Sequence, residues 1–296
     1  MTLRSATGTD RDAVLALGVA EETAWFGEAE VSAEEVGEWV DDEGGMAPGV
    51  VALDDAGRVS GFASPGRHEA LFLADPARTD AAADELLPWL LEQRDRVELM
   101  TFASDGARVA AFERHGLNHR RSSFSLVRPD SAGPLPAGAV PAGIDVAPYR
   151  LGAADEAVHR LIYVDAAWAS VPGHAERDLR AWREMAGRAA TTLLARRGGR
   201  PAGWVAGRLL ASGRGWVDTL AVARSERRRG LGRALLLRAL SDLQRAGARG
   251  LGLDVEAENE GALGLYRSVG LEVEREWRTY AVTAASRTSG GRRARR

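Results

Sequence analysis

Hydrophobic and polar residues follow two periods along the second half of the chain, and these periods predict alternating strands and helices. Apolar residues gather or alternate in the short runs 191–196, 204–210, 216–222 and 251–255, which favour buried strands. The segments 153–165, 179–185 and 234–240 place apolar residues three or four positions apart, as amphipathic helices do. This order predicts an α+β fold, a mixed and mostly antiparallel sheet with helices on both faces.

The first half of the chain resembles the second. Residues 71–78 parallel 220–227 at an offset of 149 residues, and residues 111–117 parallel 265–271 at an offset of 154. The matching order predicts a tandem duplication. Its boundaries are read from composition, because the segment between the copies is rich in Pro, Gly and Ala and has no apolar period. We expect a first domain over 1–128, a linker over 129–143, a second domain over 144–283, and a basic, disordered tail over 284–296.

Composition narrows the possible chemistry. The 296 residues contain no Cys, which excludes disulfides, thiolate nucleophiles and Cys-based metal sites, and no His pair has metal-ligand spacing. The net charge of −3 gives no general attraction to nucleic acid. No apolar run reaches the length of a membrane span or resembles a signal core. We therefore expect a cytoplasmic enzyme that uses no metal and binds neither nucleic acid nor a membrane.

A glycine-containing loop stands between the 216–222 strand and the following Leu-rich helix. Its residues are Arg227, Arg228, Arg229, Gly230, Leu231, Gly232, Arg233 and Ala234. A strand that turns sharply into a helix presents several unpaired backbone N–H groups at the positive end of the helix dipole. The two glycines allow an anion to approach the main chain closely. The loop therefore predicts a phosphate or pyrophosphate site made of main-chain amides.

The pattern of Arg227, Gly230 and Gly232 resembles the acyl-CoA signature of the GNAT superfamily of N-acetyltransferases. A second block, in which Asn259 precedes a short helix that carries Tyr266, also resembles the family, and the likeness covers most of 144–283. It implies acetyl-CoA as acyl donor, a primary amine of a small molecule as acceptor, and a monomer or homodimer. Carried over position by position, it gives as cofactor-binding residues the eight loop residues 227–234 together with Leu220, Ala221, Val222 and Asn259. In the family a backbone N–H at a strand bulge polarises the thioester carbonyl, which we expect near Leu220–Val222.

Two side chains are candidates for proton transfer. Asp218 alternates with Trp216, Leu220 and Val222 on one predicted strand face, which favours it as the base; a cross-strand partner is the alternative role. Tyr266 is the candidate acid for the departing thiolate, with a core aromatic as its alternative. Lesser candidates are the carboxylates Glu256 and Glu258 and the histidines His159 and His174, and Asn259 has helix capping as a sufficient role.

The first copy differs from the second where chemistry is expected. Ala81 stands at the position of Gly230, Asp80 adds a negative charge beside it, and Phe112 has no proton where Tyr266 has one. We therefore expect a degenerate, non-catalytic domain that supports the second, with modified CoA binding as the alternative.

The identity of the acceptor stays open. Residues 12–57 contain many Asp and Glu and no Arg, which suits either a solvated face or a cationic acceptor such as a polyamine or aminoglycoside. The tandem layout also resembles mycothiol synthases, whose acceptor is a cysteinyl pseudo-disaccharide. A peptide N-terminus is a further acceptor, and a non-catalytic acyl-CoA sensor or structural protein is the alternative of another class.

Overall fold

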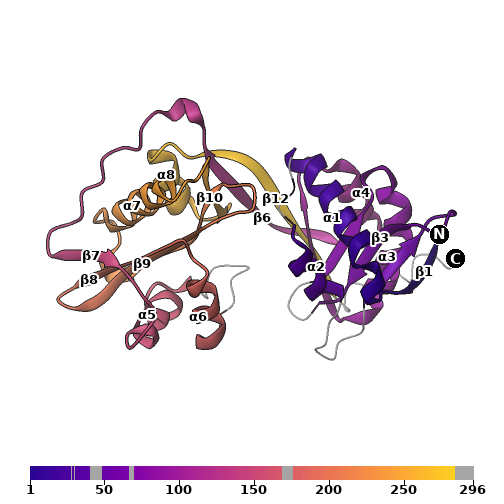
Figure 1. Ribbon diagram of the computed structural model, residues 1–296, viewed down its shortest axis with the longest axis horizontal. Helices are drawn as coiled ribbons and strands as arrows, with labels where there is room; N and C mark the ends of the chain where they lie inside the picture. The colour runs from indigo at the N-terminus through magenta and orange to yellow at the C-terminus, as the bar shows by residue number, and fades with distance from the viewer. Residues whose placement is uncertain (28, 30, 41–48, 67–69, 169–175, 284–296) are drawn as a thin grey trace, which may run out of the picture. The chain divides into compact units, whose positions relative to one another are not determined.

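The computed structural model describes residues 1–27, 29, 31–40, 49–66, 70–168 and 176–283, and the chain divides into two compact units (Figure 1). Unit 1 contains Met1–Ser122 and the residues from Glu276 onward. Unit 2 contains Ser123–Arg275. Two strands, β6 (Asn118–Arg128) and β12 (Glu272–Thr283), have residues in both units.

Unit 1 contains two separate groups of paired strands. Its strands and helices are β1 (Thr2–Ser5), α1 (Arg11–Phe26), α2 (Ala33–Val40), β2 (Val50–Leu53), β3 (Val59–Ser64), β4 (Leu71–Ala74), α3 (Thr79–Gln93), β5 (Arg96–Phe102) and α4 (Gly106–Arg114). Strands β1, β2, β3 and β4 form an antiparallel sheet in that order. Strand β5 pairs antiparallel with residues 277–283 of β12.

Alternation along the strands of unit 1 divides its core between two faces. Val51, Phe62 and Leu73 pack with α1 and α2. Their neighbours Ala63 and Phe72 pack instead with α3 and α4. Because successive strand residues point to opposite faces, this period of two places helices on both sides of the sheet.

In unit 2, six strands of a longer sheet pair in the order β6-β11-β10-β9-β8-β7, and among these pairs only β10 and β11 are parallel. The elements of unit 2 are β7 (Ile144–Pro148), α5 (Asp155–Arg160), a π-helical turn (Leu161–Asp165), α6 (Leu179–Gly187), β8 (Thr191–Arg197), β9 (Arg200–Leu209), β10 (Gly215–Val222), α7 (Leu231–Arg245), β11 (Leu251–Glu256) and α8 (Glu260–Ser268). Figure 1 shows α7 and α8 on one side of this sheet and α5 and α6 on the other. The predicted α+β class, with mostly antiparallel sheets and helices on both faces, is confirmed.

The division into units differs from the predicted boundaries in one respect. Composition placed a break after residue 128, but residues 123–128 pair with β11 in unit 2, and the final strand completes unit 1 by pairing with β5. Pairing between strands that are far apart in the chain does not depend on local composition. The sequence therefore could not show that residues 123–128 pair in unit 2 and that the final strand pairs in unit 1. The predicted tail over 284–296 lies outside the described residues.

The Pro/Gly/Ala segment 129–143 follows unit 2 closely. Arg128 donates hydrogen bonds to the carbonyls of Ala132, Gly133 and Pro134, and Arg233 on α7 donates to Ala137 O. The segment therefore lies along unit 2 although it has no regular apolar pattern.

Candidate active site

A cavity of about 1300 Å³ in unit 2 opens where β10 and β11 separate. It is lined by β10, the loop after it, the start of α7, the end of β11 and the start of α8. Of the residues that the sequence singled out, those that line it are Asp218, Leu220, Ala221, Val222, Arg227, Arg228, Gly230, Gly232, Arg233, Glu256, Glu258, Asn259 and Tyr266.

Strand separation exposes the backbone of β10. The parallel pairing of β10 with β11 runs from Gly215 opposite Leu251 to Val217 opposite Leu253, and ends there. From Asp218 to Val222, the side of β10 that faces β11 therefore has no strand partner among the described residues. Backbone donors and acceptors on such an open edge are available to an extended ligand.

A β-bulge lies at the same point, and it corrects two sequence expectations. The register of β10 against β9 shifts between Val217 and Thr219, not near Leu220–Val222. A bulge reverses the alternation, so that Leu220 packs on the α7 face together with Val217. Trp216 and Leu220 therefore do not share a face as predicted. The residues at the bulge, Val217 to Thr219, include no Gly or Pro. The sequence therefore could not reveal the bulge.

The loop before α7 has the backbone geometry of an anion site. Arg228 and Gly230 both have left-handed conformations, with φ of 61° and 86°. Helix α7 begins at Leu231, and its first backbone bond to the loop runs from Ala234 N to Gly230 O, so the N–H groups of residues 231–233 have no intrahelical acceptor. These amides and the helix dipole make this terminus attractive to phosphate.

Not all eight loop residues turn their side chains toward the cavity. Leu231 and Ala234 are buried in the core beneath α7, and Arg229 lies 3.7 Å from Glu226. The Arg227 guanidinium donates to Val222 O at 3.1 Å and to Ala166 O at 2.6 Å. Arg227 therefore braces the loop against the segment after the π-helical turn. This role was not visible from the sequence because Ala166 is 61 residues away.

Tyr266 lines the cavity from α8 and is 8% exposed. Its hydroxyl has no hydrogen-bond partner within the described part of the chain, and burial raises its pKa to about 12. The group therefore stays protonated at neutral pH. The hydroxyl can therefore donate a hydrogen bond to a ligand in the cavity.

Asp218 lies at the bulge, and its Oδ1 accepts from Arg208 Nε at 2.9 Å. Burial raises the pKa of this carboxyl, the Arg208 charge lowers it, and the nearby Asp254 raises it again. The net rise makes Asp218 a stronger base than an ordinary aspartate.

The remaining candidates have structural partners. Asn259 caps α8, with its Oδ1 accepting from Ala262 N at 3.1 Å, while it also lines the cavity. His159 contacts Arg177 O at 2.7 Å and packs on Tyr163 and Trp182, away from the cavity lining. His174 lies outside the described residues.

Sequence reasoning missed a cluster on the sheet face of this cavity. Trp216 on β10 lies over Gly252 of β11, so closely that a Cβ at Gly252 would stand 2.2 Å from the indole ring. Its Nε1 donates to Asp254 Oδ2 at 3.0 Å. A glycine within a buried strand indicates that another group approaches its backbone closely. Gly252 was therefore the sequence signal from which this cluster could have been predicted.

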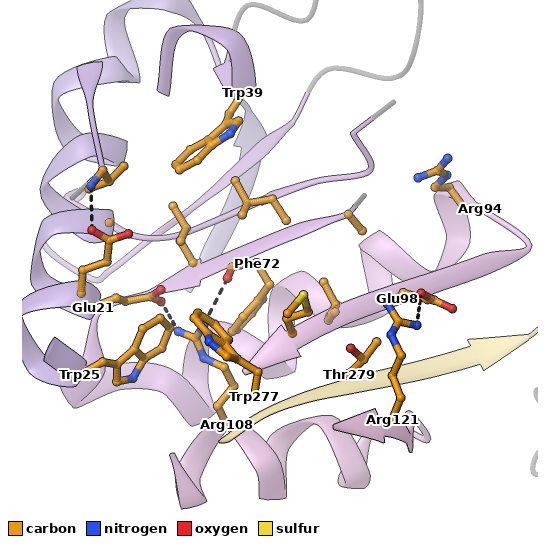
Figure 2. A pocket seen from close by; sticks show the side chains of 18 of the residues that line it. Glu21, Trp25, Trp39, Phe72, Arg94, Glu98, Arg108, Arg121, Trp277 and Thr279 are labelled. Carbon is orange, nitrogen blue, oxygen red and sulfur yellow. Dashed lines mark hydrogen bonds and ion pairs between the residues drawn. The ribbon is translucent and has the colours of Figure 1, made fainter. Parts of the chain in front are cut away.

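Unit 1 has a smaller cavity, of about 550 Å³, at the matching place between β4 and β5 (Figure 2). The backbone groups of β4 at this cavity are already hydrogen-bonded by side chains. The Glu21 carboxylate accepts from Ala74 N at 2.5 Å, while Arg108 donates to Phe72 O and forms a buried ion pair with Glu21. Trp25 and Phe72 lie on the Arg108 guanidinium, 4.7 and 5.2 Å from it, and complete its enclosure.

The amide loop is also missing from unit 1. At the offset of 149 residues Leu231 corresponds to Ala82, yet α3 already begins at Thr79. The residues that match Arg228–Gly230 are therefore helical. Asp80 stands in the first helical turn, where it pairs with Arg114 at 3.1 Å.

Residues 158–271 match the family model described as Acetyltransferase (GNAT) family. This stretch lies within unit 2 and contains the loop, the open strand edge and Tyr266. Unit 2 therefore carries a GNAT acetyltransferase domain. The resemblance stated from the sequence is confirmed, and GNAT membership supports acyl transfer, for which the family generally uses acetyl-CoA.

Solved structures extend the fold likeness over both units. A GCN5-related N-acetyltransferase from Sphaerobacter thermophilus is 23% identical with a TM-score of 0.76, over 96% of this chain and 95% of that one. A tandem GNAT protein from the clavulanic acid biosynthesis pathway is 16% identical with a TM-score of 0.73, over 96% of this chain and 99% of that one. At these identities the likeness shows the fold of a tandem GNAT protein. A search of curated proteins finds no match.

Two further findings concern the described residues only. They contain no group of three or more His, Asp or Glu side chains placed to hold a metal ion. None of their helices is both long and apolar enough to cross a membrane.

Proposed function

We propose that this protein transfers an acetyl group from acetyl-CoA to the primary amine of a small molecule, within the cavity of unit 2. The observation that carries this proposal is the convergence of three features in one cavity. They are the amide loop before α7, the open edge of β10, and the unpartnered hydroxyl of Tyr266.

The donor is held along β10. The pyrophosphate of acetyl-CoA lies on the amides of the loop from Arg228 to Arg233, and the pantetheine arm runs along the open strand edge toward the bulge. A bulge leaves backbone groups of the extra residue out of the ladder, and an N–H there polarises the thioester carbonyl.

Asp218 receives the proton that the amine must lose. An alkylammonium with a pKa near 10.4 is less than about 0.1% neutral at pH 7, a deficit of about 4–5 kcal/mol. Asp218 takes this proton directly or through water. The neutral amine nitrogen then attacks the thioester carbon, the C–N bond forms, and the C–S bond breaks. The second proton that the nitrogen loses as the amide forms passes to solvent.

Tyr266 serves the leaving group as a hydrogen-bond donor. Because burial raises its pKa to about 12, full proton transfer to a thiolate whose conjugate acid has a pKa near 8.5 is uphill. A hydrogen bond to the sulfur stabilises the developing negative charge without that transfer. CoA leaves as a thiolate and is protonated by solvent.

Unit 1 does not hold acetyl-CoA in this proposal. The backbone groups of β4 that would bind an extended ligand are satisfied by Glu21 and Arg108, and helix α3 replaces the amide loop. Unit 1 is a retained fold without the acetyl-transfer site.

The test is amine-dependent release of CoA thiol by the intact chain, with mass spectrometry of the acetylated product. The acceptor panel contains simple amines, diamines, an aminoglycoside, a cysteinyl sugar and a short peptide. Thiol release with a matching product supports acetyl transfer. Tight binding of acetyl-CoA without release for any acceptor contradicts it and favours an acyl-CoA sensor.

A further inference from the structure

A set of side chains on one face of the unit 2 sheet is not used in holding the donor. In the strand register, Trp216 stands opposite Arg208 of β9 on one side and opposite Gly252 of β11 on the other. Directly opposite residues share a face. Trp216, Arg208 and Asp254, together with Asp218, therefore gather at the beginning of the strand separation, and all four line the cavity.

The Trp216 ring is held in a fixed position. Gly252 leaves room for the indole to lie against the backbone of β11, and the Nε1 donates to Asp254 Oδ2 at 3.0 Å. The second oxygen of Asp254 accepts from Ser125 Oγ at 2.6 Å. An aromatic ring and a carboxylate that are fixed next to each other form an arrangement suited to an organic cation.

A separate observation indicates that a ligand belongs in this cavity. The Tyr266 hydroxyl lines the same space from α8, its side chain is only 8% exposed, and it has no partner within the described part of the chain. The hydroxyl faces the cavity, where a bound ligand can accept a hydrogen bond from it.

The cavity lining carries charges of both signs. Arg224, Arg227, Arg228 and Arg233 follow the carboxyl end of β10, where they suit an anionic donor. On the strands, Asp218 and Asp254 line the cavity together with Arg208, which is paired with Asp218. Carboxylates at this place suit a cationic acceptor.

We propose that Trp216 and Asp254 form a subsite for a second positive charge on the acceptor, beside the reacting amine at Asp218. The proposal rests on the acetyl transfer proposed above and names its substrate class: a primary amine that carries another cationic nitrogen a short distance away.

Asp218 and Asp254 lie on neighbouring strands where these strands begin to separate, close enough for the charge of Asp254 to raise the pKa of Asp218. A short diamine can therefore place one nitrogen at each carboxylate. The subsite therefore favours propane-1,3-diamine over propylamine, which lacks the second charge, and over 3-aminopropanoate, which replaces it with an anion.

The experiment compares kcat/KM for these three acceptors with the intact chain and saturating acetyl-CoA. The ratio of propane-1,3-diamine to propylamine should be at least about tenfold, as expected for a cation bound by both a carboxylate and an aromatic face. Asp254→Asn keeps the shape and an acceptor oxygen for Trp216, and it should lower this ratio toward one. Trp216→Leu should lower it as well.

The matched control is Asp145→Asn on β7, an exposed carboxylate outside the cavity, which should leave the ratio and the rate unchanged. Turnover of all three amines at similar efficiency would overturn the subsite and leave acetyl transfer standing. A ratio that survives Asp254→Asn would also overturn it. Binding of acetyl-CoA without turnover of any amine would overturn the proposed function itself, and the subsite with it.

Discussion

Units 1 and 2 each have a cavity between two strands, β4 and β5 in unit 1 and β10 and β11 in unit 2, and the chain fills the two spaces differently. In unit 2 the edge of β10 beyond Val217 is open, and the loop before α7 presents free amides. In unit 1 the corresponding edge of β4 is bonded by Glu21 and Arg108, and α3 absorbs the loop. The separation of the strands thus belongs to the fold, whereas the ability to hold a donor depends on a few residues that either leave the edge open or occupy it.

Arg108 illustrates how a single position changes the outcome. It occupies the first turn of α4, and at the offset of 154 residues its counterpart on α8 is Ala262. Both helices are capped alike, by Asp105 and Asn259. The two helices therefore begin in the same way and differ in the length of one side chain. Arg108 extends to β4, whereas the short side chain of Ala262 does not fill the cavity beside β10.

The largest expected effect concerns the ion pair that fills unit 1. Arg108→Met leaves the Glu21 carboxylate buried without its partner, which should lower the free energy of unfolding by about 3–5 kcal/mol. Urea unfolding measures this loss. The control is Arg114→Met, whose partners Asp80 and Asp84 are exposed, so that solvent screens the pair and the loss should be much smaller. Equal losses in the two variants would show that the buried pair does not hold unit 1 together.

The second effect concerns the residue pair Tyr266 and Phe112. Tyr266→Phe gives unit 2 the side chain of unit 1 and should lower kcat by about 10–100-fold, because a hydrogen bond to the leaving sulfur is lost. The affinity for CoA, measured by calorimetry, should stay within about twofold. Phe112→Tyr is the matched change in unit 1 and should leave kcat unchanged. A wild-type rate for Tyr266→Phe would remove Tyr266 from the mechanism.

The third effect concerns the loop. Gly230 has φ of 86°, a conformation that costs an L-residue about 1–2 kcal/mol, and its counterpart Ala81 is helical. Gly230→Ala should therefore weaken CoA binding by about tenfold, since this cost converts at 1.4 kcal/mol per factor of ten. Ala81→Gly should leave CoA affinity unchanged. An equal loss of affinity from both substitutions would place a donor site in unit 1 as well.

The smallest effect is a shift in pH dependence. Asp218 acts as a base only when ionised, so kcat/KM should fall as the pH drops through its pKa, which burial raises above the ordinary aspartate value. Arg208→Gln removes the charge that lowers this pKa, so the acid limb should move to higher pH. Arg238→Gln on α7 is the control, because its partner is Asp242. A limb that stays in place in Arg208→Gln would exclude Asp218 as the titrating base.

Local sequence features predicted much of the local structure around the candidate site in unit 2. The loop around Gly230, the cap at Asn259 and the place of Tyr266 on α8 depend on neighbouring residues, and the sequence carries these directly. Contacts between distant residues could not be predicted. Glu21 meets Arg108 across 87 residues, and Trp216 meets Asp254 across 38. The bulge at Asp218 also depends on pairing with β9, and it overturned the facing that simple alternation predicted for Leu220.

The number of CoA molecules bound by the intact chain tests the contrast between the two units most directly. Isothermal titration of the wild type should give one site per chain, and Gly230→Val should abolish that binding because a β-branched residue does not adopt the required φ. Two sites per chain, or one site that survives Gly230→Val, would contradict the assignment of the donor to unit 2.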